Sequence, residues 1–256
     1  MRMTSIKPSP ALASLVRTFT IVETDVETER TLMPEPGALL AIRYRGSAAL
    51  MEHGRASILP DVTLTGMRNA VRRMKTSTGG AVIVTSFRED GAGLLFDVPM
   101  HLLFNEVIGA DHLVPADDIE ELRAAVAVAG DLSTRIRTVE QFLLARKPCG
   151  RRDLTVLAAV RAMRAAHGAI PIRTLAAGLG LSQDRLEKRF RRLVGTTLKR
   201  YCSILRLRFA VAGSRTGNLA EVAAEAGYYD QSHFIREFRT VTGEPPQKFF
   251  RGTEYC

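Results

Sequence analysis

The sequence predicts an α+β protein, with an antiparallel β barrel or sandwich first, a helical pair next and an all-α domain last. Three observations support this fold class. Short β-branched runs separated by Gly and Pro recur between residues 7 and 96, two apolar stripes at helical spacing occupy residues 117–146, and residues 170–250 contain one helical pattern twice. A chain of 256 residues, 46% of them hydrophobic, is long enough for two domains with separate cores.

The β-rich part begins near Lys7. The turn Pro34-Glu35-Pro36-Gly37 follows the first well-defined run, and the fairly regular spacing of Gly and Pro favours antiparallel strands. After the strands we expect a short helix from Pro99 to Ile108 that ends at Gly109. The expected strand runs are 30–33, 39–44, 48–52, 58–59, 62–65, 71–76 and 81–87.

Residues 117–146 predict two helices that are separated near Gly130 and Asp131. Each helix carries apolar residues at spacings of three and four, so each should bury one face. The two apolar stripes are Ile119, Leu122, Val126 and Ala129, then Ile136, Val139, Phe142 and Leu143.

A change of composition marks the boundary between two domains. Residues 147–152 combine Pro, Gly and three basic side chains, which is typical of a linker. We therefore expect an N-terminal domain over 1–146 and a C-terminal domain over 153–256. A helix over 154–167, closed by Gly168, should open the second domain.

The two copies within residues 170–250 match position by position. Each copy has an Ala-rich helix, a turn built on glycine and a second helix with an aromatic anchor followed by Arg, which is the pattern of a helix-turn-helix. The offset between copies is 47 at the turn glycines Gly180 and Gly227, and 48 at the anchors Phe190 and Phe238. One residue is therefore inserted in the turn.

The turn residues have the properties that this interpretation requires. Gly180 and Gly227 would adopt the left-handed backbone conformation that ends the first helix. Ser182 and Asp230 would then cap the second helix of each copy. Since apolar residues in those helices recur at i, i+4, the opposite faces remain free to meet a partner.

Charge indicates what that partner is. Residues 150–256 contain 19 Lys and Arg against 9 Asp and Glu, a net charge of +10, whereas residues 1–149 contain 17 against 18, a net charge of −1. Such a domain is expected to bind a phosphate backbone; a merely solvated helix face would explain the charge but not the duplicated turn. A joining helix over 197–214, about 25 Å long at 1.5 Å per residue, would hold the second helices about 34 Å apart, the distance between successive major grooves.

This segment resembles the DNA-binding domain of the AraC/XylS family of bacterial transcription regulators. The resemblance covers about 85 of the 256 residues. Tyr228 departs from the usual Phe, and Tyr229 stands where a small or acidic residue is common. The residues that carry the resemblance are Leu175, Ala176, Gly180, Leu181, Ser182, Leu186, Phe190, Arg191, Gly195, Arg206, Leu207, Arg208, Ala212, Val222, Ala223, Ala226, Gly227, Asp230, Gln231, Ser232, His233, Phe234, Phe238, Arg239, Gly243 and Pro246.

The resemblance implies that double-stranded promoter DNA is the partner and that the second helix of each copy contacts it. Arg and Lys suit guanine, Gln suits adenine, and Ile can contact a thymine methyl group. Asp184 and Glu187 fit a second interpretation equally well, as acidic partners of a helix N-terminus. The expected DNA-binding residues are Gln183, Asp184, Arg185, Glu187, Lys188, Arg189 and Arg192 in the first copy, and Gln231, Ser232, His233, Ile235 and Arg236 in the second.

For the N-terminal half, the resemblance is weaker and implies a cupin-like domain that senses a small-molecule effector. It also implies that the helices over 117–146 form a homodimer interface. Packing of these helices against the barrel is an equally good interpretation of the same stripes, and the sequence does not separate the two.

Nothing in the sequence indicates catalysis. It has no Gly-rich phosphate loop, nucleophile elbow or paired-carboxylate spacing, and His53, His101 and His112 are too far apart for a metal-bearing cupin. We therefore expect no metal, no cofactor and no enzymatic activity. Two alternatives remain: an architectural factor that coats DNA without choosing sites, and an enzyme that carries a DNA-binding module, for which Cys149 lacks reactive partners.

Cysteine usage and hydropathy bear on the compartment. The three cysteines, Cys149, Cys202 and Cys256, are scattered and should be reduced thiols. No apolar run approaches 18 residues, and no signal-peptide pattern is present. We expect a soluble cytoplasmic protein that associates with the nucleoid.

Overall fold

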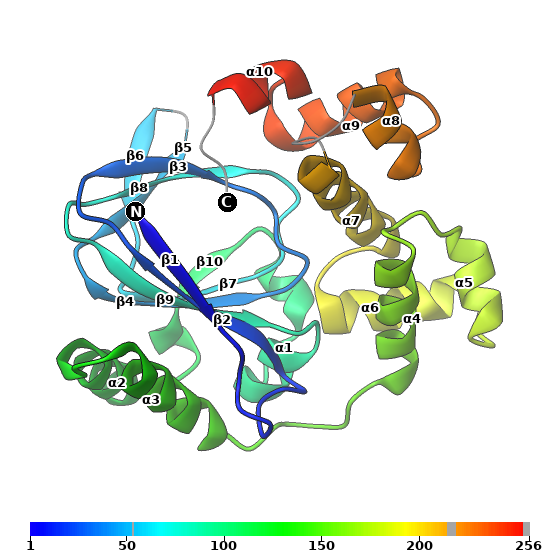
Figure 1. The fold of residues 1–256 in the computed structure, drawn as a ribbon. Helices are drawn as coiled ribbons and strands as arrows, with labels where there is room; N and C mark the ends of the chain where they lie inside the picture. The colour runs from blue at the N-terminus through cyan, green and yellow to red at the C-terminus, as the bar shows by residue number, and fades with distance from the viewer. Residues whose placement is uncertain (53, 214–218, 253–256) are drawn as a thin grey trace.

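The computed structural model describes residues 1–52, 54–213 and 219–252. In the N-terminal half two layers of β-strand lie above a pair of helices, and the C-terminal half is a group of helices beside them (Figure 1). The predicted α+β fold class is confirmed.

The N-terminal strands form two antiparallel sheets. The strands are β1 (Arg2–Ile6), β2 (Val16–Glu23), β3 (Thr28–Leu32), β4 (Leu39–Arg45), β5 (Ala48–Glu52), β6 (Arg55–Ile58), β7 (Val62–Thr65), β8 (Arg72–Thr76), β9 (Ala81–Phe87) and β10 (Val107–Gly109). The six-stranded sheet has the order β1-β2-β9-β4-β7-β10, and the four-stranded sheet has the order β3-β8-β5-β6.

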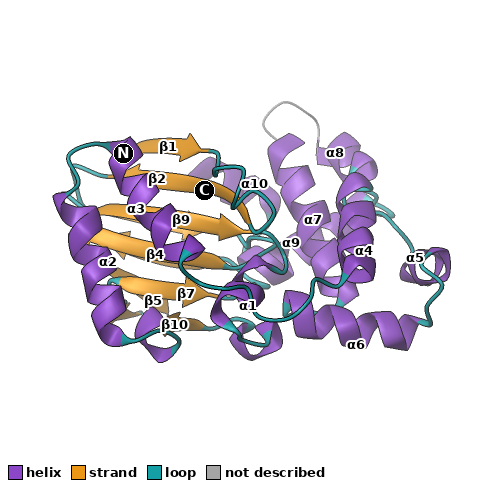
Figure 2. Ribbon diagram, turned by 90° about the horizontal axis from the view of Figure 1, so that it is seen from below, coloured by secondary structure: helices purple, strands orange, loops and turns teal. Residues whose placement is uncertain are grey.

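The helical pair predicted in residues 117–146 is confirmed as α2 (Ala116–Val128) and α3 (Leu132–Leu144). Asp131 caps α3 by accepting a hydrogen bond from the Thr134 backbone nitrogen at 2.9 Å. Figure 2 shows both helices across one face of the six-stranded sheet, and their apolar stripes are buried there. The structure thus supports the packing interpretation of these stripes.

Side-chain alternation gives the six-stranded sheet two different faces. In β2, Phe19 and Ile21 are buried against the helices, whereas Thr20 and Val22 line the space between the two sheets. The main N-terminal core therefore lies between this sheet and its helices. The space between the two sheets contains a cavity lined by residues of both.

The chain after β9 differs from the prediction. A short helix, α1 (Gly91–Phe96), lies in the stretch expected to be mainly strands, and the helix expected over 99–108 is wrong. In its place a 3-10 helix (Met100–Leu103) ends at Phe104, whose backbone is extended, and Asn105 follows with a positive φ of 65° that turns the chain. The chain then enters β10, which pairs antiparallel with β7.

The C-terminal half follows the predicted plan. Its helices are α4 (Leu154–Ala165), α5 (Ile172–Gly178), α6 (Gln183–Val194), α7 (Leu198–Gly213), α8 (Leu219–Glu225), α9 (Gln231–Thr242) and α10 (Pro246–Gly252). Helices α5 and α6 form the first helix-turn-helix unit, and α8 and α9 form the second. The joining helix α7 was expected over 197–214; its last expected residue, Ser214, lies outside the described residues.

Both turns have the geometry that the sequence predicts. Gly180 and Gly227 have positive φ values of 65° and 75°. The Ser182 hydroxyl accepts from the Arg185 nitrogen at 3.3 Å, and the Asp230 carboxylate accepts from the His233 nitrogen at 2.6 Å. Helices α6 and α9 therefore start in the same way.

Each C-terminal unit has its own core, and each core includes a methionine from the N-terminal half. The first unit buries Phe190 against Tyr201 and also contains Met67, which is 1% exposed. The second unit buries Phe238 and contains Met33, which is 4% exposed. The N-terminal half is thus packed into both units.

Glu89 connects the two halves by buried polar contacts. One of its carboxylate oxygens accepts from the Tyr201 hydroxyl at 2.7 Å and from Arg164 Nε at 2.8 Å, and lies 2.9 Å from an Arg17 nitrogen. Burial alone would raise the pKa of Glu89, but the charges of Arg164 and Arg17 and the Tyr201 hydroxyl hold that pKa below its ordinary value. The carboxylate is therefore ionised although it is buried, and its partners Tyr201 and Arg164 are present only when the two halves are together.

A pair of glycine substitutions tests the turn geometry. We expect Gly180→Ala to cost about 1 kcal/mol of unfolding free energy, because it adds only left-handed strain; no other atom lies within 4 Å of the new Cβ. Gly227→Ala adds similar strain, and its Cβ would lie 2.6 Å from the Ala169 Cβ. It should cost roughly 1–3 kcal/mol more, as measured by chemical denaturation. Equal losses for the two variants would show that the second turn is not packed against Ala169.

Replacing Glu89 by Gln tests the connection between the halves. We expect Glu89→Gln to lower the free energy of unfolding by roughly 3 kcal/mol at neutral pH, because the half-buried Arg17 and Arg164 lose the buried charge that they pair with. Since the folded-state pKa of Glu89 is lowered, its stabilisation is complete above the ordinary glutamate range near 4.3 and is lost as the pH falls through the folded-state pKa. The gap between wild type and variant should therefore narrow on acidification.

The matched control for that substitution is Glu120→Gln. Glu120 forms an exposed pair with Arg123 within α2, so its loss should leave the free energy of unfolding nearly unchanged. If the difference in unfolding free energy between wild type and Glu89→Gln is the same at every pH, the charge on Glu89 does not hold the halves together.

Candidate nucleic-acid interface

The first expected recognition helix, α6, presents a polar face to solvent. Leu186, Phe190 and Val194 recur at i, i+4, i+8 and are buried in the core of the first unit. Most residues expected to contact DNA lie on the opposite side and are exposed. These are Gln183, Asp184, Arg185, Lys188 and Arg192.

Two of the expected α6 residues are engaged within the protein. Arg189 Nε lies 2.7 Å from an oxygen of Asp153, whose carboxylate also caps α4. The hydrogen bond to Asp153 raises the pKa of Arg189. Glu187 accepts from the Leu198 backbone nitrogen at 3.3 Å, at the start of α7. Both side chains hold neighbouring helices here and would have to change partners to contact DNA.

The second expected recognition helix, α9, is built in the same way. Phe234 and Phe238 are buried, whereas Gln231, Ser232 and Arg236 are exposed. Ile235 is half-buried and lies at the edge of the exposed face.

His233, the remaining expected residue of α9, is half-buried beside its own unit. Its ring lies edge-on to Tyr228 at 5.4 Å between centroids, and its Nε2 lies 3.6 Å from Glu237. These contacts orient the ring along the helix. His233 therefore packs against the turn of the second unit through Tyr228, while part of its side chain stays exposed.

The exposed faces of the two helices are equivalent. On α9 a shallow groove is lined by one helical stripe, consisting of Ser232, Ile235, Arg236, Arg239 and Thr240. The offset of 48 places the corresponding stripe of α6 at Asp184, Glu187, Lys188, Arg191 and Arg192. Arg191 and Arg239 are exposed on these stripes and were missed as candidate DNA contacts, although the i, i+3, i+4, i+7 spacing could have identified them.

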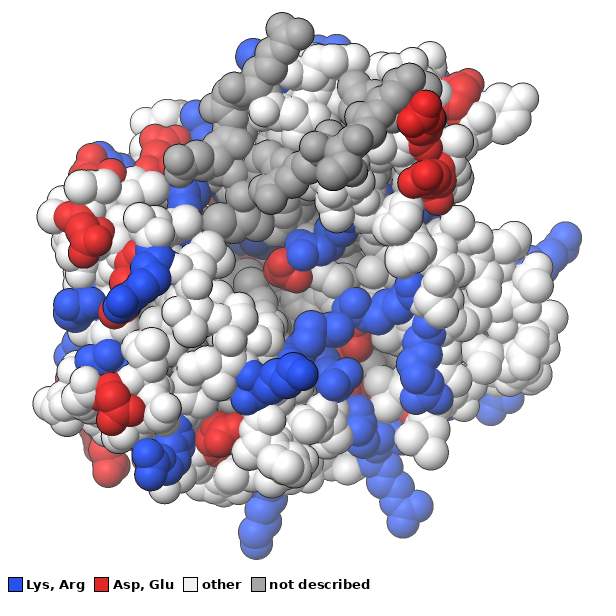
Figure 3. Space-filling model, in the orientation of Figure 1, with Lys and Arg blue, Asp and Glu red and all other residues white. Residues whose placement is uncertain are grey.

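The spacing and charge of the two helices suit one extended ligand. Figure 1 places α6 and α9 at opposite ends of α7, which spans about 24 Å at 1.5 Å per residue. In Figure 3 Lys and Arg side chains gather from the centre to the lower right, over the region of α4 and α6, while both signs are mixed over the strands at the left. Within the described ranges, no carboxylate lies at ion-pair distance from Arg236 or Arg239.

Other site types find no support in the part of the chain that the structure describes. There, no group of three or more His, Cys, Asp or Glu side chains is arranged to hold a metal ion. Cys149 is exposed and Cys202 is buried, both as free thiols; Cys256 and His53 lie outside the described residues. None of the described helices has the length and apolar character needed to cross a membrane.

Comparison with protein families identifies two regions. Residues 175–252 match a family described as a helix-turn-helix domain. Residues 4–109 match a domain of unknown function, DUF6597. A comparison with curated proteins finds no match.

Comparison with solved structures finds one fold shared over most of the chain. A ToxT variant from Vibrio cholerae strain SCE256, without ligand, is 12% identical over 94% of this chain and 98% of its own, with a TM-score of 0.50, which shows the fold alone. Wild-type ToxT from that strain, bound to an unsaturated fatty acid, is 14% identical over 92% and 95%, with a TM-score of 0.48. The C-terminal domain of AraT, a response regulator from Geobacillus stearothermophilus, is 20% identical over 40% and 88%, with a TM-score of 0.37.

Arg236 gives the sharpest test of base contact. We expect Arg236→Ala to weaken binding to a preferred duplex by roughly 1–3 kcal/mol and to relax the choice at one base pair, as measured by fluorescence anisotropy on a set of single-substituted duplexes. Lys248→Ala is the matched control, because it removes one exposed positive charge on α10 that pairs with Glu244. An equal loss for Arg236→Ala on every duplex would mean that Arg236 contacts only phosphate.

Proposed function

We propose that one chain of this DNA-binding transcription regulator recognises one promoter sequence by placing α6 and α9 in successive major grooves. The proposal starts from the AraC-type helix-turn-helix domain that residues 175–252 form. The observation that carries the proposal is the equivalence of the two exposed stripes. Each includes exposed basic side chains, each lies opposite a buried aromatic anchor, and each belongs to a helix that begins at a side-chain cap. A protein that used only one helix would have no need for the second stripe.

The residues divide into two kinds of contact. Gln183, Lys188, Gln231 and Arg236 are exposed and carry donors or acceptors that suit base edges in the major groove. Arg185, Arg191, Arg192 and Arg239 supply positive charge beside them for phosphates. Ser232 and Ile235 add a hydroxyl and an apolar contact on α9.

We further propose that the N-terminal half senses a small molecule in the space between its sheets. A cavity of about 220 Å³ opens there, lined by side chains from both sheets. Such a concave, mainly apolar site with a few polar groups is typical of small-molecule binding. The contacts of Met33, Met67 and Glu89 with the C-terminal units provide a route by which occupancy could alter the presentation of α6 and α9.

A homodimer through residues 117–146 remains part of the proposal, but through a different face from the one expected. The stripes predicted for this role pack on the sheet. The outer surface of the pair exposes Val128 at 83% and Leu144 at 50%, and sedimentation of wild type against Val128→Asp would test whether it joins two copies.

Selection of bound fragments from random DNA by the full chain tests the proposed function. We expect one bipartite sequence to be enriched, with two preferred blocks about one helical turn apart, because the two helices occupy successive grooves. The enriched duplex should bind roughly a thousandfold or more tightly than a scrambled one at physiological salt.

The architectural alternative gives the opposite result. Binding would then depend steeply on salt, through counterion release, with little preference among sequences. If no sequence is enriched and binding is strong at low salt, the result supports a factor that coats DNA and contradicts a site-specific regulator.

A further inference from the structure

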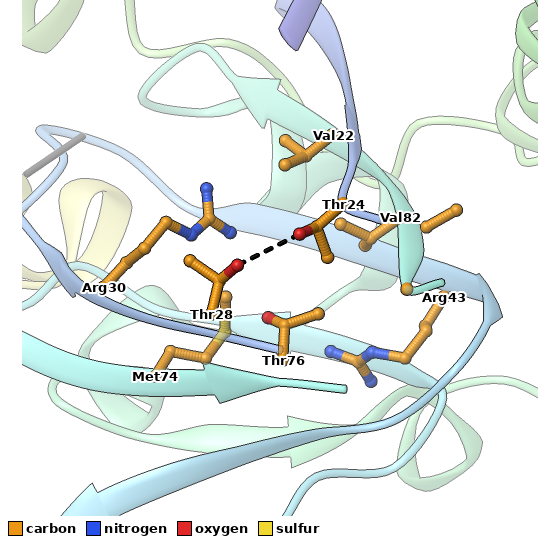
Figure 4. A pocket seen from close by; sticks show the side chains of 10 residues that line it. Val22, Thr24, Thr28, Arg30, Arg43, Met74, Thr76 and Val82 are labelled. Atoms are coloured by element: carbon orange, nitrogen blue, oxygen red, sulfur yellow. Dashed lines mark hydrogen bonds between the residues drawn. The ribbon is translucent and has the colours of Figure 1, made fainter. Parts of the chain in front are cut away.

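The space between the two sheets has two ends of very different size. Figure 4 shows the narrow end, where Arg30 and Arg43 approach Thr24, Thr28 and Thr76, and where the Thr24 and Thr28 hydroxyls lie 3.0 Å apart. Only about 10 Å³ is free there, which is room for about one water molecule. The wider part of the space, about 220 Å³, lies toward the C-terminal domain and reaches Met33, Glu35 and Arg68.

The wall of the wider part is aliphatic. No Phe, Tyr or Trp ring is among the described residues that line it. Flexible or branched aliphatic side chains favour an alkyl ligand over a flat aromatic one, because no ring face is offered for stacking. The apolar wall residues include Leu32, Leu39, Leu50, Leu59, Val84 and Val107.

Four arginines line this space: Arg30 and Arg43 also line its narrow end, whereas Arg68 and Arg72 line the wider part alone. Neither Arg68 nor Arg72 pairs with a buried carboxylate of the described residues. Arg68 is 5% exposed, and its Nη2 donates a long hydrogen bond, 3.4 Å, to the Met33 carbonyl oxygen. Burial, reinforced by the nearby charge of Arg72, lowers the pKa of Arg68 to about 10, so it is still charged at neutral pH. Within the described residues, no carboxylate lies at ion-pair distance from Arg68.

Arg72 is partnered only in part: its Nη2 donates a hydrogen bond to the Asn105 carbonyl oxygen. Its Nη1 is buried and has no hydrogen-bond partner in the described parts of the chain. Its Nε lies 3.7 Å from Glu52, whose side chain is 56% exposed. Among the described residues that line the cavity, Glu35 is the one carboxylate, and it pairs with Arg208 on α7 at 2.6 Å.

A buried guanidinium whose donors are only partly satisfied is costly, and an oxyanion with two acceptor oxygens satisfies it best. We propose that this cavity binds an aliphatic organic anion, whose carboxylate or phosphate head lies between Arg68 and Arg72 and whose alkyl chain lies along the leucine and valine wall. This inference names the ligand class of the proposed sensing site. Only its regulatory consequence rests on the proposed function.

The position of Arg68 connects this site to both DNA-binding units. Its chain neighbour Met67 belongs to the core of the first unit, and the carbonyl group that it contacts belongs to Met33, in the core of the second. Beyond Met33, the carbonyl of Pro34 and the carboxylate of Glu35 accept from Arg208. An anion that draws Arg68 away from Met33 therefore acts on the wall that both units pack against.

Calorimetric titration of the full chain without DNA tests the site. The probes are the straight-chain carboxylates from butanoate to dodecanoate, octyl phosphate, 1-octanol and inorganic phosphate. We expect at least one carboxylate or octyl phosphate to bind saturably and at least tenfold more tightly than 1-octanol or inorganic phosphate. The head group that binds more tightly, carboxylate or phosphate, identifies the chemical class of the natural anion.

Three variants assign the binding to the arginines. Arg68→Met and Arg72→Met should each weaken binding of the best probe at least tenfold, which is 1.4 kcal/mol. Arg73→Met is the matched control, because Arg73 is the neighbour of Arg72 on β8, faces outward and pairs with Glu29. It should bind like wild type. Two arginine variants guard against one failing to fold.

The proposal is overturned if no probe in the series binds, if 1-octanol binds as tightly as the anions, or if both arginine variants bind like wild type. Its failure is distinct from failure of the proposed function. Anion binding together with no enriched DNA sequence would contradict the proposed DNA recognition and support the anion site. An enriched DNA sequence together with no anion binding would support the DNA recognition and contradict the anion site.

Discussion

The buried carboxylate of Glu89 is the interaction that fixes how the two halves of this protein meet. Its partners come from both sides: Arg17 belongs to the N-terminal strands, and Arg164 and Tyr201 belong to the C-terminal helices. A carboxylate in this position is costly to bury unless all three donors are present. The arrangement of the halves is therefore set by charge and hydrogen bonding as well as by the apolar contacts of Met33 and Met67, and the recognition helices inherit their positions from it.

The two helix-turn-helix units share a plan but are held differently. The first is fixed at several points: Arg189 pairs with Asp153, and a Cβ at Gly195 would lie 2.6 Å from the Met100 carbonyl oxygen of the N-terminal half. At the equivalent Gly243, nothing lies within 4 Å. The end of α6 is thus packed on the N-terminal half at its closing glycine, whereas the end of α9 meets that half through a hydrogen bond from the Val71 backbone nitrogen to the Val241 carbonyl oxygen at 3.0 Å. A signal from the cavity would reach the first unit through this close packing and the second through Met33, Val71 and the Glu35–Arg208 pair.

The C-terminal half could be predicted from the sequence because its signals are local. Cap residues, turn glycines and i, i+4 anchors act within a few residues, and Ser182, Gly227 and Phe238 all occupy their expected places. The 3-10 helix and β10 could not be predicted in this way. Their form depends on Asn105 and on pairing with β7, a partner about forty residues earlier in the chain.

The sequence predicts which side chains of the candidate site are exposed, but not which of them pair with other side chains of the protein. Helical spacing is sufficient to place Gln183, Lys188 and Arg236 on free surfaces. The pairing of Arg189 with Asp153 depends on how α4 crosses α6, which no local pattern encodes. The buried position of Arg68 was also hidden, because an arginine in a loop between strands is usually solvated.

Hydroxyl-radical footprinting of the full chain on its enriched duplex tests the central claim most directly, since it maps where one protein molecule covers the DNA. Two protected patches on one face of the duplex, about 10 base pairs between centres, are the result expected if α6 and α9 enter successive major grooves. A single patch the width of one helix, or uniform protection along the duplex, would contradict recognition by both helices.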